Sequence, residues 1–246
     1  MIKLIKISKS FKGQKVLDDL DLTIEAEKIT VIIGQSGGGK SVLLKHIIGL
    51  IRPDTGQILV DGTDIGAASE KQLNNIRKQF GMLFQDAALF DSMTVGENIA
   101  FPLKEHTRLT EKKIMEIVES KLALVGLKNI SHKMPSELSG GMRKRVGLAR
   151  AIALDPKIIL FDEPTTGLDP LMCNAINNLI VEAQRNTKAT CVVISHDIES
   201  TFRIAHKIAM LYHGKIIESG TPDEIRRSNH PVVQEFIGSW KNKAQQ

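Results

Sequence analysis

The order of apolar and helical patterns predicts an α/β protein with a mostly parallel core sheet, an N-terminal antiparallel β region and an inserted helical subdomain. Three observations lead to this class. The first residues alternate between polar and apolar, which is typical of half-buried antiparallel strands. Residues 28–34, KITVIIG, form a β-branched run that reads as a buried central strand, and a glycine-rich stretch and a helix follow it. After residue 156, short apolar runs again alternate with helical patterns.

The first third of the chain is predicted to begin with two antiparallel strands. Apolar residues recur about every second position on both sides of a turn at Gly13: Ile2, Leu4, Ile7, Leu20, Leu22 and Ile24. After the buried strand and its glycines, apolar residues return at helical spacing: Leu43, Leu44, Ile47 and Ile48. A strand at 56–62, a polar helix at 69–79 and a strand at 81–85 follow.

A helical stretch from about 86 to 156 interrupts the alternation and is expected to form a subdomain of its own. One amphipathic helix is predicted at 111–125, with Thr110 as its N-cap and Gly126 as its C-cap. A second helix is predicted at 142–154, basic at its start and apolar later.

Beyond this subdomain, strands and helices alternate once more. The expected elements are strands at 157–164 and 190–196, helices at 171–184 and 197–206, a hairpin at 208–220 and a short helix from Thr221. These elements place one domain at 1–230 and leave 231–246 as a C-terminal tail.

Composition narrows the class of protein. The chain has 246 residues, an apolar share of 42% and a charged share of 25%, which is ordinary for a globular protein. No apolar run approaches the roughly 20 residues that cross a bilayer, and the start lacks a secretory signal, so we expect a cytosolic protein. Cys173 and Cys191 have a spacing that suits neither a zinc site nor a redox pair.

The net charge of +5 does not by itself indicate a nucleic-acid partner, because the Lys and Arg residues are scattered along the sequence. One Tyr and one Trp are too few for a platform that stacks bases. We therefore expect no nucleic acid among the partners.

Residues 34–41 match the phosphate-loop pattern and lie between a predicted strand and a predicted helix, as that pattern requires. Gly34, Gln35, Ser36, Gly37, Gly38 and Gly39 would surround phosphates with backbone N–H groups, because glycines leave no side chain in the way. Lys40 would reach the β- and γ-phosphates, and the Ser41 hydroxyl would ligate Mg²⁺.

The carboxylates expected beside such a loop follow the buried strand at 157–164. Asp162 would hold Mg²⁺, and Glu163 would act as the general base on an attacking water. A solvated turn would be the alternative, but the apolar residues directly before Asp162 argue against it. Together with the phosphate loop, these residues predict hydrolysis of ATP or GTP.

A second anion site is predicted at Ser139, Gly140 and Gly141, which precede a helix. One nucleotide needs only one such cradle. If two copies pack head to tail, the Ser139 loop of each can close on the γ-phosphate held by the other, so the sequence predicts a homodimer through its nucleotide sites.

With these motifs, the chain resembles the ATP-binding subunits of ABC transporters, a family of P-loop NTPases, along nearly its whole length. The motifs occur in the order of that family: 34–41, Gln85, 138–142, 159–164, 167–169 and His196. The resemblance implies ATP and Mg²⁺ as ligands, with nucleotide contacts extending to Val42. It also implies that Gln85 contacts the metal and the lytic water, that Asp169 helps arrange the opposite site, and that His196 bonds the γ-phosphate.

Two positions depart from the family pattern. The signature usually ends in Gln, and here Met142 stands there; since the contacts come from Ser139 and backbone groups, activity is expected to survive. Phe11 occupies the position of an aromatic, commonly Tyr, that stacks on adenine. A place in a small core is the alternative for Phe11.

The resemblance also implies that integral membrane permease subunits are separate proteins. Leu89, Phe90 and Phe101, with Pro102 as a breaker, lie in the segment where we expect the docking groove for a coupling helix; a plain core is the alternative. The tail could pack Phe236 and Trp240 on a neighbouring subunit, or fray.

The stretches 37–50, 81–103 and 138–142 are similar to ATPases of Mla-type (Mce-associated) transporters. That likeness implies phospholipid transport between membranes, a substrate-binding lipid-carrier subunit, and a peripheral position on the cytoplasmic side of the inner membrane. The alternatives are another ABC transporter, a soluble ABC protein acting on ribosomes or DNA, and a regulatory module; Glu163 and His196 argue against the last.

Overall fold

The computed structural model describes residues 1–243, with side chains described as far as residue 238. The chain divides into two compact units, the first formed by 1–77 with 190–246 and the second by 78–189. No helix in the described residues is both long enough and apolar enough to cross a membrane.

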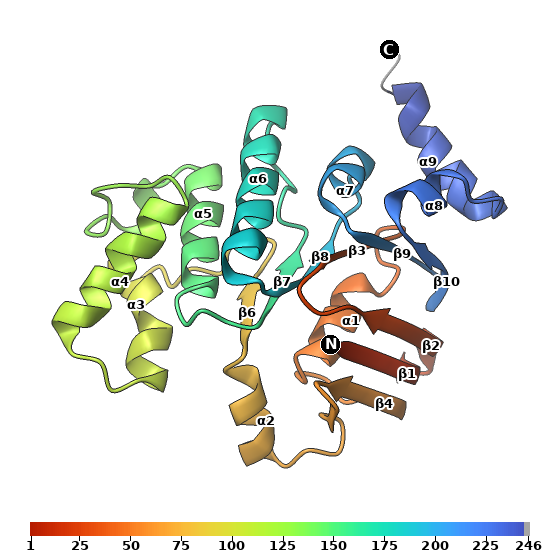
Figure 1. Cartoon of the computed structure of the whole chain (residues 1–246), viewed down its shortest axis with the longest axis horizontal. Helices are drawn as coiled ribbons and strands as arrows, with labels where there is room; N and C mark the ends of the chain where they lie inside the picture. Colours follow the sequence, from red (N-terminus) through yellow and green to blue (C-terminus); the bar gives the residue numbers. More distant parts are fainter. Residues whose placement is uncertain (244–246) are drawn as a thin grey trace. The chain divides into compact units, whose positions relative to one another are not determined.

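The first unit contains the expected N-terminal antiparallel sheet (Figure 1). Its strand order is β2-β1-β4-β5. The bounds are Ile2–Phe11 for β1, Gln14–Ile24 for β2, Thr55–Val60 for β4 and Thr63–Asp64 for β5. β1 pairs antiparallel with both β2 and β4, and Ile2 and Leu4 are buried, as the period-two pattern predicts. A register shift between Leu4 and Ile7 interrupts that period, so the buried Ile7 lies three positions after Leu4.

The first unit also contains strands in the order β10-β9-β3-β8, of which β9, β3 and β8 are parallel. The bounds are Ile29–Ile33 for β3, Thr190–Ile194 for β8, Lys207–Tyr212 for β9 and Lys215–Gly220 for β10. β3 lies parallel to β8 and β9, and β10 returns antiparallel to β9 as the predicted hairpin. All residues of β3 and β8 are buried, as expected for strands covered on both faces.

The helices of the first unit follow these strands. The bounds are Lys40–Ile47 for α1, Glu70–Arg77 for α2, Ile198–Ile204 for α7, Pro222–Arg226 for α8 and Pro231–Lys243 for α9. Helix α9 falls in the segment that the sequence analysis left as a tail. Phe236 is half-buried within it, while the side chain of Trp240 lies outside the described residues.

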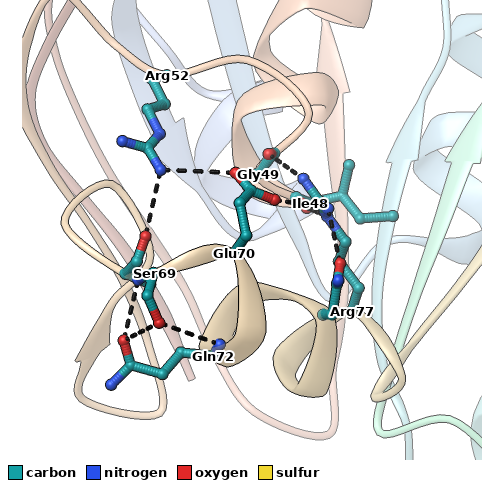
Figure 2. A network of polar contacts seen from close by, with 9 residues as sticks. Ile48, Gly49, Arg52, Ser69, Glu70, Gln72 and Arg77 are labelled. Carbon is teal, nitrogen blue, oxygen red and sulfur yellow. Dashed lines mark hydrogen bonds and ion pairs between the residues drawn. The ribbon is translucent and has the colours of Figure 1, made fainter.

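Helix α2 closes the C-terminal end of α1 through a polar network (Figure 2). Arg77 donates from Nη2 to the carbonyl oxygen of Gly49 at 2.7 Å and from Nε to that of Ile48 at 3.5 Å. Glu70 lies between Arg77 and Arg52, at 3.8 and 3.7 Å. A guanidinium at a helix C-terminus satisfies its last carbonyls and complements the helix dipole, so this network anchors α1 at the end opposite the glycine loop.

The second unit contains a parallel strand pair and its helices (Figure 1). The bounds are Phe80–Leu83 for β6, Val95–His106 for α3, Glu111–Leu124 for α4, Pro135–Glu137 for the 3₁₀-helix η1, Gly140–Ala151 for α5, Ile158–Asp162 for β7 and Pro170–Thr187 for α6. A Cβ atom on Gly81 would lie 2.1 Å from the carbonyl oxygen of Ala151, so the glycine lets α5 approach β6 closely.

Three local predictions need correction. Pro102 does not end the helix but lies inside α3. The capping box at Thr94 and the buried apolar residues of α3 stabilise the helix by more than the backbone hydrogen bond lost at Pro102. The helix predicted at 142–154 begins at Gly140, because Ser139 serves as its N-cap, and ends at Ala151. Thr110 is confirmed as the N-cap of α4, but the C-cap is Val125, and Gly126 follows it with a φ of +69°.

Candidate nucleotide-binding and hydrolysis site

The glycine-rich loop joins β3 to α1 in the first unit (Figure 1). Gly34 has a φ of +153°, and a Cβ atom there would lie 2.2 Å from the carbonyl oxygen of Leu211. Gly39 has a φ of +93° and is the N-cap of α1, with no side-chain hydrogen bond to the first turn. Neither position accommodates a Cβ atom without strain, so both need glycine. Because no side chain caps α1, the backbone N–H groups at its N-terminus are left for a ligand.

Lys40 is 4% exposed although it carries a charge. Its Nζ donates to the carbonyl oxygens of Gly34 at 2.9 Å and Gln35 at 2.8 Å. The ammonium is therefore held inside the loop by the loop's own backbone. A fixed positive charge at a helix N-terminus is suited to a highly charged anion such as a triphosphate.

The remaining loop positions are accessible to a ligand. Those with exposed or half-buried side chains or backbone are Gln35, Ser36, Gly37, Gly38, Ser41 and Val42. A cavity of about 190 Å³ lies beside the loop, between the backbone of Gly37 and Gly38 and the turn that joins β9 to β10 at His213 and Gly214. There is consequently room for part of a ligand next to the loop.

Phe11, at the end of β1, is 42% exposed, so the alternative that placed it in a small core is wrong. The nearest cation over its ring is Lys9, whose Nζ lies 5.6 Å from the ring centroid. An exposed ring offers a π face to a planar ligand, which leaves the proposed adenine contact as the reading for this residue.

His196 lies two residues after the buried strand β8 ends at Ile194, and its side chain is exposed. The next residue, Asp197, is the N-cap of α7, and its Oδ1 accepts from the backbone N–H of Ser200 at 3.3 Å. The strand before it and the cap after it fix the backbone, so the imidazole is presented at the carboxyl end of a parallel strand. Ligands of α/β sheets bind at that edge.

In the second unit, Asp162 ends β7 and Glu163 follows it, and both side chains are half-buried. Glu163 has a φ of +47°, a strained value for a residue with a side chain. The hydroxyl of Thr166 donates to Oε2 of Glu163 at 2.9 Å. The turn therefore restrains the carboxylate that the sequence analysis predicted to be the general base.

Ser139 is exposed and caps α5, its Oγ accepting from the backbone N–H of Met142 at 3.3 Å. A Cβ atom on Gly140 would meet nothing within 4 Å, whereas one on Gly141 would lie 2.4 Å from Cε of Met172. The start of α5 is thus open to solvent on the side of Ser139 and Gly140, and Gly141 permits close packing on α6. An open helix N-terminus of this kind can receive an anion from another molecule.

Gln85 and Asp169 are both exposed in the second unit. Gln85 comes two residues after β6 ends at Leu83. Asp169 is the N-cap of α6, and its Oδ1 accepts from the backbone N–H of Met172 at 3.0 Å. Both side chains therefore lie at the surface, and Oδ1 of Asp169 also serves as the cap of α6.

An apolar groove in the second unit is formed by residues on both sides of Gln85 in the sequence. It has a volume of about 420 Å³ and is lined by Phe80, Met82, Phe84, Phe90, Phe101 and Pro102, with Arg150 at one side. The rings of Phe90 and Phe101 are 42% and 37% exposed, and their centroids are 5.1 Å apart. These side chains line a groove at the surface, so the plain-core alternative is wrong for Phe90 and Phe101; Leu89 is half-buried.

With this geometry in place, comparison with known proteins identifies the family. A family model described as ABC transporter matches residues 17–166. The chain belongs to this family. The dimeric ATP-binding cassette MJ0796, solved with ADP and phosphate bound, has a fold similar to that of this chain with a TM-score of 0.84 at 30% identity, over 90% of this chain and 99% of that one. The predicted ABC ATPase fold is confirmed.

Two groups of curated relatives are similar over most of the chain. The intermembrane phospholipid transport system ATP-binding protein MlaF of Haemophilus influenzae is 45% identical over 92% of this chain and 86% of its own length. The probable ribonucleotide transport ATP-binding protein mkl of Mycobacterium tuberculosis is 46% identical over 94% of this chain. The chain spans 64% of the length of the Mycobacterium bovis and Mycobacterium tuberculosis relatives.

Sequence reasoning missed one charged residue next to the candidate site of this ABC family member. Lys144 is 6% exposed, and its Nζ donates to the carbonyl oxygen of Thr166 at 2.5 Å, in the turn that carries Glu163. The available signal was helical periodicity, because Lys144 has the same phase as the buried Gly141, Leu148 and Ala151 of α5.

Proposed function

We propose that this chain is the ATP-hydrolysing subunit of a transporter and works as a homodimer. The observation that carries the proposal is the loop between β3 and α1, where the buried Lys40 ammonium and a helix start without a capping side chain form a cradle for phosphates. Membership of the ABC transporter family supports the proposal.

The donor atoms at the predicted metal positions fit Mg²⁺, which prefers oxygen ligands. Ser41 offers a hydroxyl, Asp162 a carboxylate and Gln85 an amide oxygen. We propose that these residues hold the ion. When bound, Mg²⁺ would neutralise charge on the phosphate oxygens.

The remaining roles belong to the protein's own side chains. Glu163 orients the attacking water and accepts its proton, with its carboxylate restrained by Thr166. Lys40 stabilises negative charge on the β- and γ-phosphates, and His196 donates a hydrogen bond to the γ-phosphate. Phe11 stacks on the adenine through its exposed ring.

The second half of each site comes from the partner copy. Ser139, Gly140 and Gly141 close on the γ-phosphate held by the other chain, and Asp169 helps arrange that opposite site. The exposed Ser139 hydroxyl and the open space over Gly140 support this role. Two nucleotides are then enclosed at a two-fold interface.

The apolar groove around Phe90 and Phe101 is proposed to receive the coupling helix of a membrane permease subunit. The likeness to the MlaF proteins favours phospholipid as the cargo, with a lipid-carrier subunit as a further partner and a peripheral position on the cytoplasmic side of the inner membrane. No nucleic acid is expected among the partners.

The hydrolytic assignment is tested with Glu163→Gln. Because the amide cannot accept the proton of water, ATP turnover by the purified chain is expected to fall at least about 100-fold, while ATP still binds. The measurements are phosphate release and ATP binding by titration calorimetry. Glu182→Gln, which changes an exposed carboxylate of α6, is the matched control and should hydrolyse ATP normally. Unchanged turnover in the Glu163 variant would refute this assignment of the base.

The cargo is tested on the complex isolated from its native membrane. Integral membrane proteins should co-purify with the chain, and mass spectrometry of the complex should detect bound phospholipids. Enrichment of ribonucleotides without phospholipid would favour the function named for the mycobacterial relatives, and isolation with ribosomes would contradict a transport role.

A further inference from the structure

Lys144 is a buried cation on α5. Burial of an ammonium is costly unless hydrogen bonds and opposite charges compensate. Burial lowers the pKa of Lys144, while the nearby Asp86, Cys173 and Glu163 act in the opposite direction. A buried lysine on a packed helix face is therefore expected to donate a hydrogen bond that offsets the loss of hydration of its ammonium group.

The partner is the turn that carries the proposed general base. Nζ of Lys144 donates to the carbonyl oxygen of Thr166 at 2.5 Å. The hydroxyl of Thr166 donates to Oε2 of Glu163 at 2.9 Å, and its backbone N–H donates to the Glu163 carbonyl at 3.2 Å. One short chain of hydrogen bonds therefore runs from the Lys144 ammonium to the Glu163 carboxylate.

The turn needs such a support because its backbone is strained. Glu163 has a φ of +47°, which is strained for a residue with a side chain and persists only where its surroundings enforce it. The ammonium also lies in the field of Asp86, which directly follows Gln85 in the sequence. Lys144 is thus joined to the Glu163 turn by a hydrogen bond, while the charge of Asp86 favours its protonated form.

The same helix carries Ser139 at its N-cap, five positions before Lys144. At about 1.5 Å of rise per residue, the two are separated by roughly 7.5 Å along one helix axis. A helix transmits a displacement over such a distance as a rigid body. A force on Ser139 from the nucleotide of the partner copy would consequently be carried by α5 to the Lys144 ammonium.

We propose that Lys144 is a positioning residue that holds the Glu163 turn in its hydrolytic geometry and ties that geometry to the position of Ser139. This inference rests on the proposed function, since it assigns to Lys144 the support of the proposed base. Lys144 itself touches neither nucleotide nor water in this role.

The test compares Lys144→Met with the wild-type chain. Methionine keeps most of the length of the side chain but cannot donate to Thr166. The catalytic constant for ATP hydrolysis is expected to fall at least tenfold while KM changes less than about twofold. Amide hydrogen exchange at Thr166 and Leu168, whose N–H groups bond within the turn, should accelerate at least tenfold. Lys144→Arg retains a charged donor and should recover part of the lost turnover.

Lys121→Met is the matched control, because Lys121 is 8% exposed and pairs with Asp155 at 2.5 Å, on a helix of the same unit. It should lower thermal stability without lowering the catalytic constant. Thr166→Val removes the hydroxyl that reaches Glu163, so its effect on turnover and that of Lys144→Met should combine to much less than their product.

The results separate the two proposals. A wild-type chain that hydrolyses ATP, together with an inactive Glu163→Gln and a fully active Lys144→Met, would overturn the role of Lys144 and leave the proposed function intact. Equal losses in Lys144→Met and Lys121→Met, or fully multiplicative effects with Thr166→Val, would also overturn it. Absence of ATP hydrolysis in the wild-type chain would overturn both.

Discussion

In the phosphate loop, backbone hydrogen bonds fix the position of the charged side chain of Lys40. Lys40 does not extend into solvent; the carbonyl oxygens of Gly34 and Gln35 hold its ammonium within the loop. A lysine fixed in this way loses little further side-chain entropy when an anion binds, so more of the interaction energy remains available for binding. The strained Glu163 in the second unit is likewise restrained, by the hydroxyl of Thr166.

His46 gives a prediction at the same scale. It lies in α1 at 0% exposure, with Nδ1 2.8 Å from the carbonyl oxygen of Val42. Within residues 1–243, its Nε2 atom has no hydrogen-bond partner. Burial, with a smaller contribution from the charge of Lys9, lowers the pKa of His46 below its ordinary 6.5, against the opposing effects of Val42 and Asp54.

The sign of the pH dependence follows. Well above pH 6.5 both folded and unfolded chains keep this histidine neutral, so its burial costs no stability there. Below that pH the unfolded chain takes up a proton that the folded chain refuses, and stability falls as the pH decreases toward the lowered pKa. The melting temperature should therefore drop between pH 7.5 and 5.5, and drop less in His46→Leu. His132→Gln, at an exposed position, should keep the wild-type dependence; equal slopes in all three proteins would contradict the argument.

At the scale of elements, hydrogen bonds from the first turns of α3 hold the loop at 90–94, which includes Phe90 of the apolar groove. Asn98 is 0% exposed, and its Oδ1 accepts from the backbone N–H of Phe90 at 2.8 Å. Its Nδ2 lies 3.1 Å from the carbonyl oxygens of Phe90 and Met93 and 3.0 Å from that of Thr94. One amide side chain thus binds the loop at 90–94 to the helix and holds Phe90 at the edge of the groove.

Asn98→Ala should consequently destabilise the second unit by about 3 kcal/mol, because it leaves buried backbone groups without partners. Urea denaturation followed by circular dichroism measures the loss. Asn178→Ala, at an exposed position of α6, should stay within about 0.5 kcal/mol of the wild type. A similarly small effect at Asn98 would mean that the loop is held by its apolar contacts and not by this amide.

At the scale of the whole molecule, the proposed homodimer gives Ser139 two separable duties. In the single chain it caps α5, and in the dimer it is proposed to contact the partner's nucleotide. Asn is as good an N-cap as Ser but is larger, so Ser139→Asn keeps the first duty and obstructs the second.

In a Glu163→Gln background, ATP and Mg²⁺ should produce a dimer that light scattering can measure. Adding Ser139→Asn should weaken this association at least about tenfold at unchanged melting temperature, since one obstructed contact per site is repeated across the two-fold axis. Thr110→Asn, which alters the N-cap of α4 outside the proposed interface, should leave the dimer intact. Normal dimer formation by the Ser139 variant would contradict the head-to-tail arrangement.

The sequence by itself determined the features that depend on neighbouring residues. The phosphate loop at 34–41 needs glycines at positive φ before a helix, and the strand before Asp162 needs a continuous apolar run. The N-cap at Thr110 likewise depends on a hydrogen bond to Lys113, only three positions further along the chain. Each of these features involves residues that are close together in the sequence. For that reason the fold class and most of the candidate residues could be predicted from the sequence.

Only the tertiary structure decided whether particular side chains are buried and what they meet. The exposure of Phe11, the continuation of α3 through Pro102, the groove at Phe90 and the link from Lys144 to Thr166 all depend on packing between distant segments. Lys144 and Thr166 are 22 positions apart, and helical periodicity can show that a lysine faces inward without showing its partner. The physical reason is that hydrogen bonds and burial reward proximity in space, which a linear pattern records only when the two partners are also close along the chain.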